Sequence, residues 1–214
     1  MSGSHAIEWA GEEMILLPER AVWWPRQEAL ILADVHFGKS ATFRAHGIPV
    51  PEGESQEDLI RISQLLERYS ARRLVVAGDF FHSAAPLMPW LDDLLREWLE
   101  KLGPELTLVR GNHDPVRFHE IEMTTVLQLG PFLVIHDPAA APAGRPSIAG
   151  HLHPLCRIGR TGRASRVPCF VQTGSVLTVP AFGTFTSGSL VQPDKRASFF
   201  PVASGKVYAF RNCP

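Results

Sequence analysis

Gly111-Asn112-His113-Asp114 follows an apolar run, residues 106–109, that is typical of a buried strand. Pro115 blocks simple continuation of that strand, and Gly111 lets the backbone turn. A carboxamide, an imidazole and a carboxylate therefore project together from the carboxyl end of a strand, which is where open α/β sheets bind ligands. Taken alone, a simple polar turn also explains these four residues, so the rest of the chain has to decide between the two interpretations.

The first half of the chain alternates strands and helices. Apolar runs predict buried strands, and apolar residues at helical spacing predict helices between them. The expected strands are 29–33, 74–77 and 106–109, the expected helices are 55–69 and 87–101, and a hairpin over 13–24 precedes them. Three strand and helix units in series indicate a parallel or mixed sheet with crossover helices.

Residues 37–53 are punctuated by Gly and Pro, and we expect a long loop there. Lys39, Arg44 and His46 in this segment are expected phosphate contacts, although a solvated loop surface explains them equally well. Ser55 and Asp58 have the spacing of a capping box at the start of the helix that follows.

The second half of the chain lacks helical periodicity and contains short β-like runs between residues 125 and 211. These runs predict a second, mainly antiparallel sheet that faces the first, with helices outside. Residues 138–146, rich in Pro and Ala, are expected to form a surface loop. We expect one domain over residues 1–214. The apolar C-terminal strands leave two options open, which are contact with a second copy of the chain in a homodimer and completion of the second sheet.

Composition narrows the class of protein. The net charge of −1 excludes a polycation, so any nucleic-acid binding must come from a local patch. No apolar run reaches the ~18 residues that span a bilayer, and the N-terminus lacks the pattern of a signal peptide. The three cysteines are odd in number and widely spaced, which fits free thiols in a reducing cytoplasm.

Polar side chains recur at the ends of the apolar strands. They are Asp34 and His36, Asp79, Asn112 with His113 and Asp114, His136, and His151 with His153. Each one alone is explained by hydrogen bonding in the core or in a turn, but the ordered series is not a set of independent accidents. Carboxylate and amide oxygens together with imidazole nitrogen suit Mn, Fe or Zn, and the absence of thiolates argues against a structural zinc. Two cations ~3.5–4 Å apart need an anionic bridge, which a carboxylate such as Asp79 can supply.

This ordered set of motifs resembles that of the calcineurin-like metallophosphoesterase superfamily. The set is Asp34-x-His36, Gly78-Asp79, Gly111-Asn112-His113-Asp114, His136 and Gly150-His151-x-His153. Residues 32–39, 47–51, 78–83 and 177–183 further resemble the ligase-associated DNA damage response endonucleases of the PdeM type.

The resemblance implies an α/β fold in four layers, an αββα sandwich of two mixed β-sheets with flanking helices. It implies that Asp34, His36, Asp79 and His153 hold one metal and that Asp79, Asn112, His136 and His151 hold the other. His113 would not be a ligand but would sit over the scissile phosphate, oriented by Asp114. For His82 we expect hydrogen bonding behind the ligands or in the core.

The function expected from these residues is that of a phosphodiesterase or nuclease dependent on two divalent metal ions. Manganese is the expected metal, with iron or zinc as alternatives. The resemblance implies DNA as the substrate, in DNA repair alongside a DNA ligase and a helicase. A phosphatase or nucleotide phosphoesterase with a small substrate is the enzymatic alternative. A non-catalytic scaffold is another, but a scaffold is expected to have lost ligands and none is missing here.

Four arginines surround a Gly-rich turn at every third position, and they are Arg157, Arg160, Arg163 and Arg166. On an extended hairpin their side chains are not expected to share a face. A solvated tip and a phosphate-binding tip both remain open from the sequence.

Overall fold

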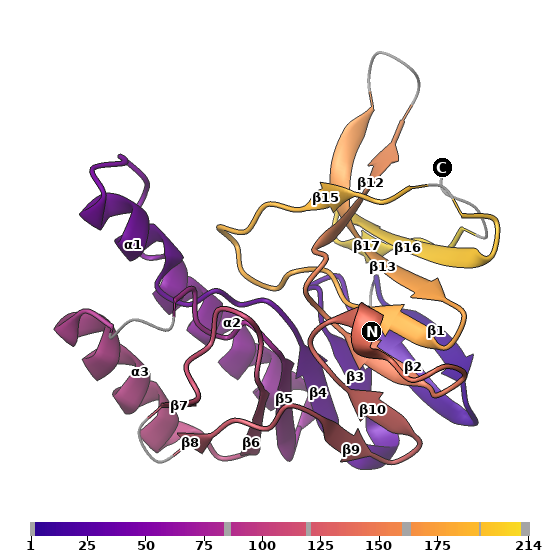
Figure 1. Cartoon of the computed structure of the whole chain (residues 1–214), viewed down its shortest axis with the longest axis horizontal. Helices are drawn as coiled ribbons and strands as arrows, with labels where there is room; N and C mark the ends of the chain where they lie inside the picture. The colour runs from indigo at the N-terminus through magenta and orange to yellow at the C-terminus, as the bar shows by residue number, and fades with distance from the viewer. Residues whose placement is uncertain (1–2, 84–86, 119–120, 160–163, 193, 211–214) are drawn as a thin grey trace.

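Two β-sheets face each other, and three α-helices cover the outer face of the first sheet (Figure 1). The computed structural model describes residues 3–83, 87–118, 121–159, 164–192 and 194–210. The expectation of two mixed sheets with flanking helices is therefore confirmed. All the α-helices of these described residues pack on the first sheet, so the second outer helical layer of the expected four-layer sandwich is not seen within these residues. None of the described helices is long and apolar enough to cross a membrane.

The first sheet has six strands in chain order. They are β1 (His5–Trp9), β2 (Glu12–Leu16), β3 (Val22–Trp24), β4 (Ala29–Leu32), β5 (Arg73–Ala77) and β6 (Glu105–Val109). Strands β1 to β4 pair antiparallel, whereas β4, β5 and β6 pair parallel as predicted. Strand β1 extends the predicted hairpin into a three-stranded meander, and a 3₁₀ turn, η1 (Pro25–Gln27), links β3 to β4.

Helices α2 (Glu54–Tyr69) and α3 (Pro89–Lys101) occupy the two predicted helical segments. A third helix, α1 (Lys39–Ala45), lies where we expected only a long loop, so that expectation is wrong. The reason is local, because the seven residues of α1 contain neither Gly nor Pro. Both glycines that bracket the helix, Gly38 and Gly47, have positive φ angles, so they start and stop it.

The capping box expected at Ser55 and Asp58 is also wrong. Gly53 is the N-cap of α2 and makes no side-chain capping bond. Ser55 Oγ instead accepts a hydrogen bond from the backbone N–H of Gly38 at 3.0 Å. Asp58 Oδ2 accepts one from the backbone N–H of Thr184 at 3.0 Å. Both side chains thus connect α2 to distant segments.

The second sheet is mixed and mainly antiparallel. Its strands are β9 (Leu127–Leu129), β10 (Phe132–Val134), β11 (Ser147–Ala149), β12 (Pro154–Ile158), β13 (Ser165–Thr173), β14 (Val176–Thr178), β15 (Ser189–Leu190), β16 (Ala197–Ala203) and β17 (Lys206–Val207). Three of its pairs are parallel, namely β10 with β11, β11 with β14 and β12 with β15. A small hairpin, β7 (Arg117–Phe118) and β8 (Ile121–Glu122), lies apart from both sheets, and η2 (Pro138–Ala140) occupies part of the predicted surface loop.

The core has two main layers, one on each side of the first sheet. Leu30 and Leu32 of β4 pack toward α2 and α3, while Ile31 packs toward the second sheet. This burial on both faces explains why β4 is a continuous apolar run. Phe200 and Val202 of β16 contribute to the layer between the sheets, so the apolar C-terminal strands complete the second sheet.

Candidate metal centre

Seven predicted metal ligands lie at strand ends of the two sheets and converge on one place. Strands β4, β5 and β6 of the first sheet lead to the first four, and β10 and β11 of the second sheet lead to the other three. The ligands are Asp34, His36, Asp79, Asn112, His136, His151 and His153, and each lies within 4 Å of at least one other. Carboxyl ends of neighbouring parallel strands meet at one sheet edge, so polar residues placed there gather together.

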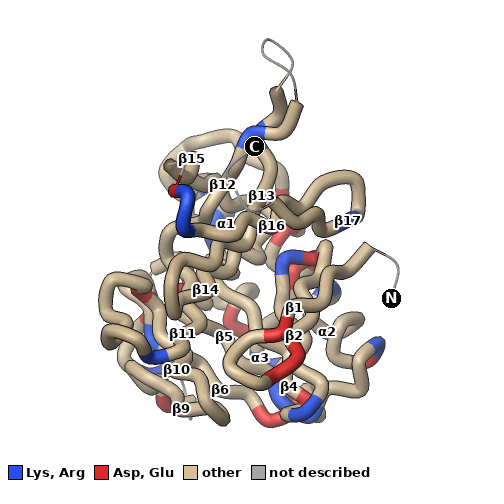
Figure 2. The backbone as a smooth tube through the Cα atoms, turned by 90° about the vertical axis from the view of Figure 1, so that its right-hand side faces the viewer, with Lys and Arg blue, Asp and Glu red and all other residues tan. Residues whose placement is uncertain are grey.

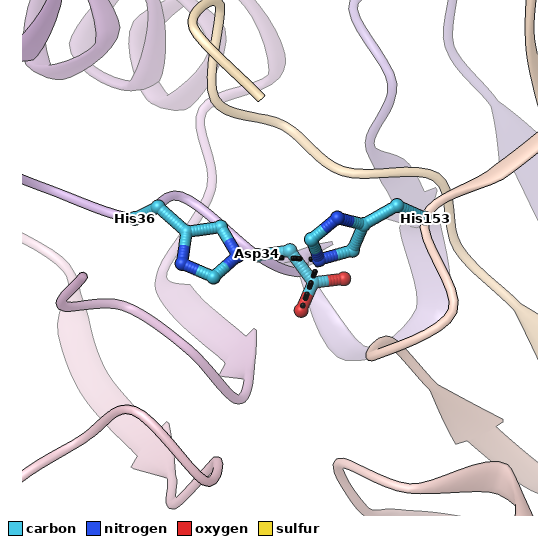
Figure 3. Close-up of side chains that lie close together, drawn as sticks. All are labelled: Asp34, His36 and His153. Carbon is cyan, nitrogen blue, oxygen red and sulfur yellow. Dashed lines mark hydrogen bonds and ion pairs between the residues drawn. The ribbon is translucent and has the colours of Figure 1, made fainter. Parts of the chain in front are cut away.

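One half of the centre is formed by Asp34, His36 and His153, whose side chains point toward one another (Figure 3). The Nε2 atoms of His36 and His153 lie 3.2 Å apart, and His153 Nε2 lies 3.4 Å from Asp34 Oδ1. The backbone carbonyl of Ser187 lies 3.0 Å from His153 Nδ1, which orients the ring so that Nε2 faces the centre. Sequence reasoning missed Ser187, because a backbone carbonyl leaves no signal in the residue type.

The other half is formed around His136. Its Nε2 atom lies 2.9 Å from Asn112 Oδ1, 3.0 Å from His151 Nδ1 and 3.4 Å from Asp79 Oδ2. The same Asp79 oxygen lies 3.9 Å from His36 Nε2 in the first half. Asp79 is thus placed between the two groups of ligands, where a carboxylate shared by two cations would lie.

The donors fit a pair of divalent cations. Asp34, His36 and Asp79 are nearly inaccessible to solvent, and the His36 nitrogen that faces the other ligands is Nε2, 3.2 Å from His153 Nε2. Burial, followed by the charges of His153 and Lys39, lowers the pKa of His36 to about 2, so its imidazole is neutral, which is the form that binds metal. Buried nitrogen and oxygen donors without counter-charge are stabilised by a cation among them.

The backbone at these ligands is strained. Five of the seven have φ angles in the left-handed region, a conformation that costs about 1–3 kcal/mol for a residue with a side chain. They are Asp34 at 55°, His36 at 52°, Asp79 at 49°, His151 at 69° and His153 at 43°. The surrounding packing holds them there: the backbone N–H of Asp34 donates to Gly78 O at 3.0 Å, and that of His36 to Asp79 O at 2.9 Å.

Two glycines allow the ligand loops to approach one another. A Cβ atom at Gly111 would overlap the carboxylate and backbone nitrogen of Asp79, and one at Gly78 would overlap the ring of His136. The glycines in the Gly-Asp and Gly-Asn-His-Asp motifs are therefore required because there is no room for a Cβ atom at either position, in addition to any need for a turn.

His113 lies beside the ligands, and 43% of its side chain is exposed. Its backbone N–H donates to Asp79 Oδ1 at 2.9 Å, and its Nε2 atom lies 4.0 Å from Asp79 Oδ2. The ring of His82 stacks on that of His113, with centroids 5.7 Å apart and planes 14° apart. His82 therefore lies at the site, and its Nδ1 is buried without a partner among the described residues.

Asp114 is buried, and both carboxylate oxygens accept hydrogen bonds from the backbone. The N–H of Phe81 donates to Oδ1 and that of Gly111 to Oδ2, each at 2.8 Å. Burial raises the pKa of Asp114 to about 6, although these two bonds oppose the shift. Within the described residues Asp114 thus fixes the loop that carries His113, rather than contacting the His113 ring as the resemblance implied.

Two of the expected phosphate contacts lie in different surroundings. Burial lowers the pKa of Lys39, and the positive charge of Lys39 adds to burial in lowering the pKa of His36 and of His82. The Arg44 guanidinium bonds within its own segment, donating to Ser40 Oγ at 3.0 Å and to Pro51 O at 2.7 Å. Arg44 therefore holds the segment after α1 in place.

Residues 29–155 match the family model of the calcineurin-like phosphoesterases, so this chain belongs to that family. Over 97% of its length it is similar to the Pseudomonas putida nuclease MPE, with 31% identity and a TM-score of 0.78, and the match covers 100% of that structure. The resemblance to a nuclease-type metallophosphoesterase is thereby confirmed.

A more distant solved structure is that of Yfce, a phosphoesterase from E. coli, with 16% identity and a TM-score of 0.43 over 82% of this chain and 88% of that one. No curated protein sequence matches.

Proposed function

We propose that this protein is a phosphodiesterase, specifically a nuclease, that depends on two divalent metal ions. The observation that carries the proposal is the position of Asp79 Oδ2, 3.9 Å from His36 Nε2 in one half of the centre and 3.4 Å from His136 Nε2 in the other. Manganese is the metal we expect, with iron or zinc as alternatives, since the donors are oxygen and imidazole nitrogen without thiolate. Asp34, His36, Asp79 and His153 would hold one ion, and Asp79, Asn112, His136 and His151 the other.

Paired cations in such a site, when bound, activate water and offset negative charge on a phosphoryl group. In the hydrolysis of a diester, the water oxygen bonds to phosphorus, the bond to one ester oxygen breaks, and that oxygen takes a proton. The half-exposed imidazole of His113 is placed to donate that proton, and such a general acid contributes typically ~10²–10⁴-fold. Asp114 supports this role by holding the loop at Gly111, and Lys39 adds a positive charge toward the phosphate.

The likeness to a nuclease over nearly the whole chain supports DNA as the substrate. The resemblance of residues 32–39, 47–51, 78–83 and 177–183 supports a role in DNA repair and a functional association with a DNA ligase and a helicase. Cys156 and Cys169 are buried and form no disulfide among the described residues, which supports a reducing compartment such as the cytoplasm.

The test is elemental analysis of protein purified without chelator, combined with rates on a chromogenic aryl phosphodiester and the matching monoester. We expect two equivalents of metal and a preference for the diester. Asp79→Ala should lose both metals and activity, whereas Asp93→Ala, at an exposed position of α3, should keep them. A preference for the monoester would indicate that the protein is a phosphatase and not a nuclease. Full activity in metal-free protein would contradict the proposal altogether.

A further inference from the structure

Charge is segregated along this chain, although the net charge is only −1. Residues 138–214 contain nine Lys and Arg residues and a single acidic residue, Asp194, whereas residues 1–137 contain 12 basic and 21 acidic residues. The basic segment includes every strand from β11 to β17, so it forms most of the second sheet. Basic segments (blue in Figure 2) lie on the β12–β13 hairpin and beside β15, and acidic segments (red) gather around β2 and β4. The positive charge that attracts a polyanion is therefore concentrated on strands β11 to β17 of the second sheet.

The β12–β13 hairpin carries two arginines directly opposite each other. Arg157 of β12 and Arg166 of β13 are cross-strand partners, and both are exposed. They therefore lie on one face of the hairpin, which corrects our expectation that the arginines share no face, whereas Arg160 and Arg163 lie outside the described residues. Like charges in this position destabilise a hairpin. No acidic side chain among the described residues pairs with either arginine, so the cost is not offset within the chain.

The hairpin is also connected to the metal centre. It projects from the body of the molecule (Figure 1), and β12 starts at the residue after His153, one of the expected ligands. Arg157 lies four residues beyond His153, which corresponds to about 13 Å along a strand at ~3.3 Å per residue. That distance equals about four base-pair steps along the axis of duplex DNA, at ~3.4 Å per step. His151 of the centre and Arg196 also line one cavity of about 960 Å³ on this side of the molecule.

We propose that the β12–β13 hairpin binds the phosphate backbone of DNA beside the cleavage site, through Arg157 and Arg166. This inference rests on the proposed nuclease function and adds the surface that holds the substrate. Guanidinium groups suit phosphate because they form paired hydrogen bonds and remain charged at every physiological pH. The two arginines bind DNA some nucleotides away from the bond that is cut, and they take no part in the hydrolysis itself.

The experiment compares the double variant Arg157→Gln/Arg166→Gln with a control, Arg72→Gln/Arg96→Gln. The control removes the same charge from two exposed arginines on the side of the first sheet, with side chains 80% and 51% exposed. Binding of a fluorescent 30-nucleotide DNA strand to the full-length protein is measured in EDTA over a range of NaCl concentrations. Hydrolysis of an aryl phosphodiester is measured separately, with manganese.

We expect the slope of log K against log salt to fall by about 1.4 in the hairpin variant, since each lost contact to single-stranded DNA removes ~0.7. The control should keep the slope of the wild type. Both variants should hydrolyse the small diester within twofold of the wild-type rate. An unchanged slope in the hairpin variant, or an equal fall in the control, would overturn the proposal. If the wild-type protein does not hydrolyse the aryl phosphodiester, the nuclease function is contradicted. The binding measurement would still decide whether the hairpin binds DNA.

Discussion

The Nε2 atoms of His36 and His153 lie 3.2 Å apart, although 117 residues separate them in the chain. Two imidazole nitrogens at this distance repel unless a proton or a cation lies between them. Burial lowers the pKa of His36, whereas at His153 burial is outweighed by the interaction with Asp34, so the pKa of His153 is raised. The folded chain therefore holds these two rings in an arrangement that a cation stabilises.

Removal of metal should lower the thermal stability. Because the cations bind the folded centre and not the dispersed ligands of the unfolded chain, each site adds ~2.7 kcal/mol when metal is present at 100 times its Kd. We expect the melting temperature to fall in EDTA and to recover when manganese is added. The control is His46→Ala, at an exposed position after α1, which should respond to metal like the wild type. A melting temperature that changes with neither EDTA nor manganese would show that metal binding does not stabilise the fold.

His113→Ala should retain metal and lose turnover. Its ring is not needed to bring the ligands together, but it is the exposed imidazole beside Asp79, so its removal should reduce kcat by ~10²–10⁴-fold. Metal content by elemental analysis and kcat on a DNA substrate measure the two effects. Undiminished kcat in a variant with verified metal content would remove His113 from the catalytic residues.

Gly111→Ala should distort the centre and destabilise the protein through steric overlap alone. The added Cβ overlaps the carboxylate and the backbone nitrogen of Asp79, and such overpacking costs ~1–3 kcal/mol. Gly103→Ala is the matched control, because a Cβ at position 103 meets nothing within 4 Å. Denaturant unfolding should separate the two variants, and equal stability would show that the loop at residue 111 can move aside.

Asp58→Ala should destabilise the fold far from the metals. Its buried carboxylate accepts hydrogen bonds from Thr184 N at 3.0 Å and Arg61 Nη1 at 2.6 Å, so its removal breaks two bonds to a charged group, at a cost of ~1–3 kcal/mol. Glu97→Ala on α3 breaks an ion pair with Lys101 at the surface and should cost less than about 1 kcal/mol. Urea unfolding checks both values. A similar loss in the two variants would mean that the bond to Thr184 contributes little.

The elements that the sequence predicted well are those with a strong periodic pattern. Strands β4, β5 and β6 and helices α2 and α3 each bury a regular apolar face, so their positions follow from local residues. The gathering of seven ligands was also predictable, because polar residues at the ends of parallel strands meet at one edge. Two of the donor clusters in the structure, Asp34 with His36 and His153 and Asp79 with His136 and His151, have the membership that the resemblance implied. A third cluster joins His113 to His36 and Asp79, although the resemblance implied that His113 is not a ligand.

The features that were missed depend on contacts between distant segments. Ser55 and Asp58 had the spacing of a cap, but their partners are Gly38 and Thr184, which no local rule identifies. The pairing of Arg157 with Arg166 depends on the register of a hairpin, and spacing along the chain does not give the register. Asp114 was expected to orient the His113 ring, yet its oxygens bond to backbone N–H groups.

The left-handed backbone at five of the expected ligands lowers the stability of the fold, while the side chains at these positions supply the donor atoms. A glycine at Asp34 or His151 would relax the backbone and at the same time delete a donor atom, so the more stable chain would be the inactive one. A descendant that no longer needed hydrolysis would gain stability by losing its ligands first, while its core stayed intact. All seven expected donors are present in this chain, as the proposed hydrolysis requires.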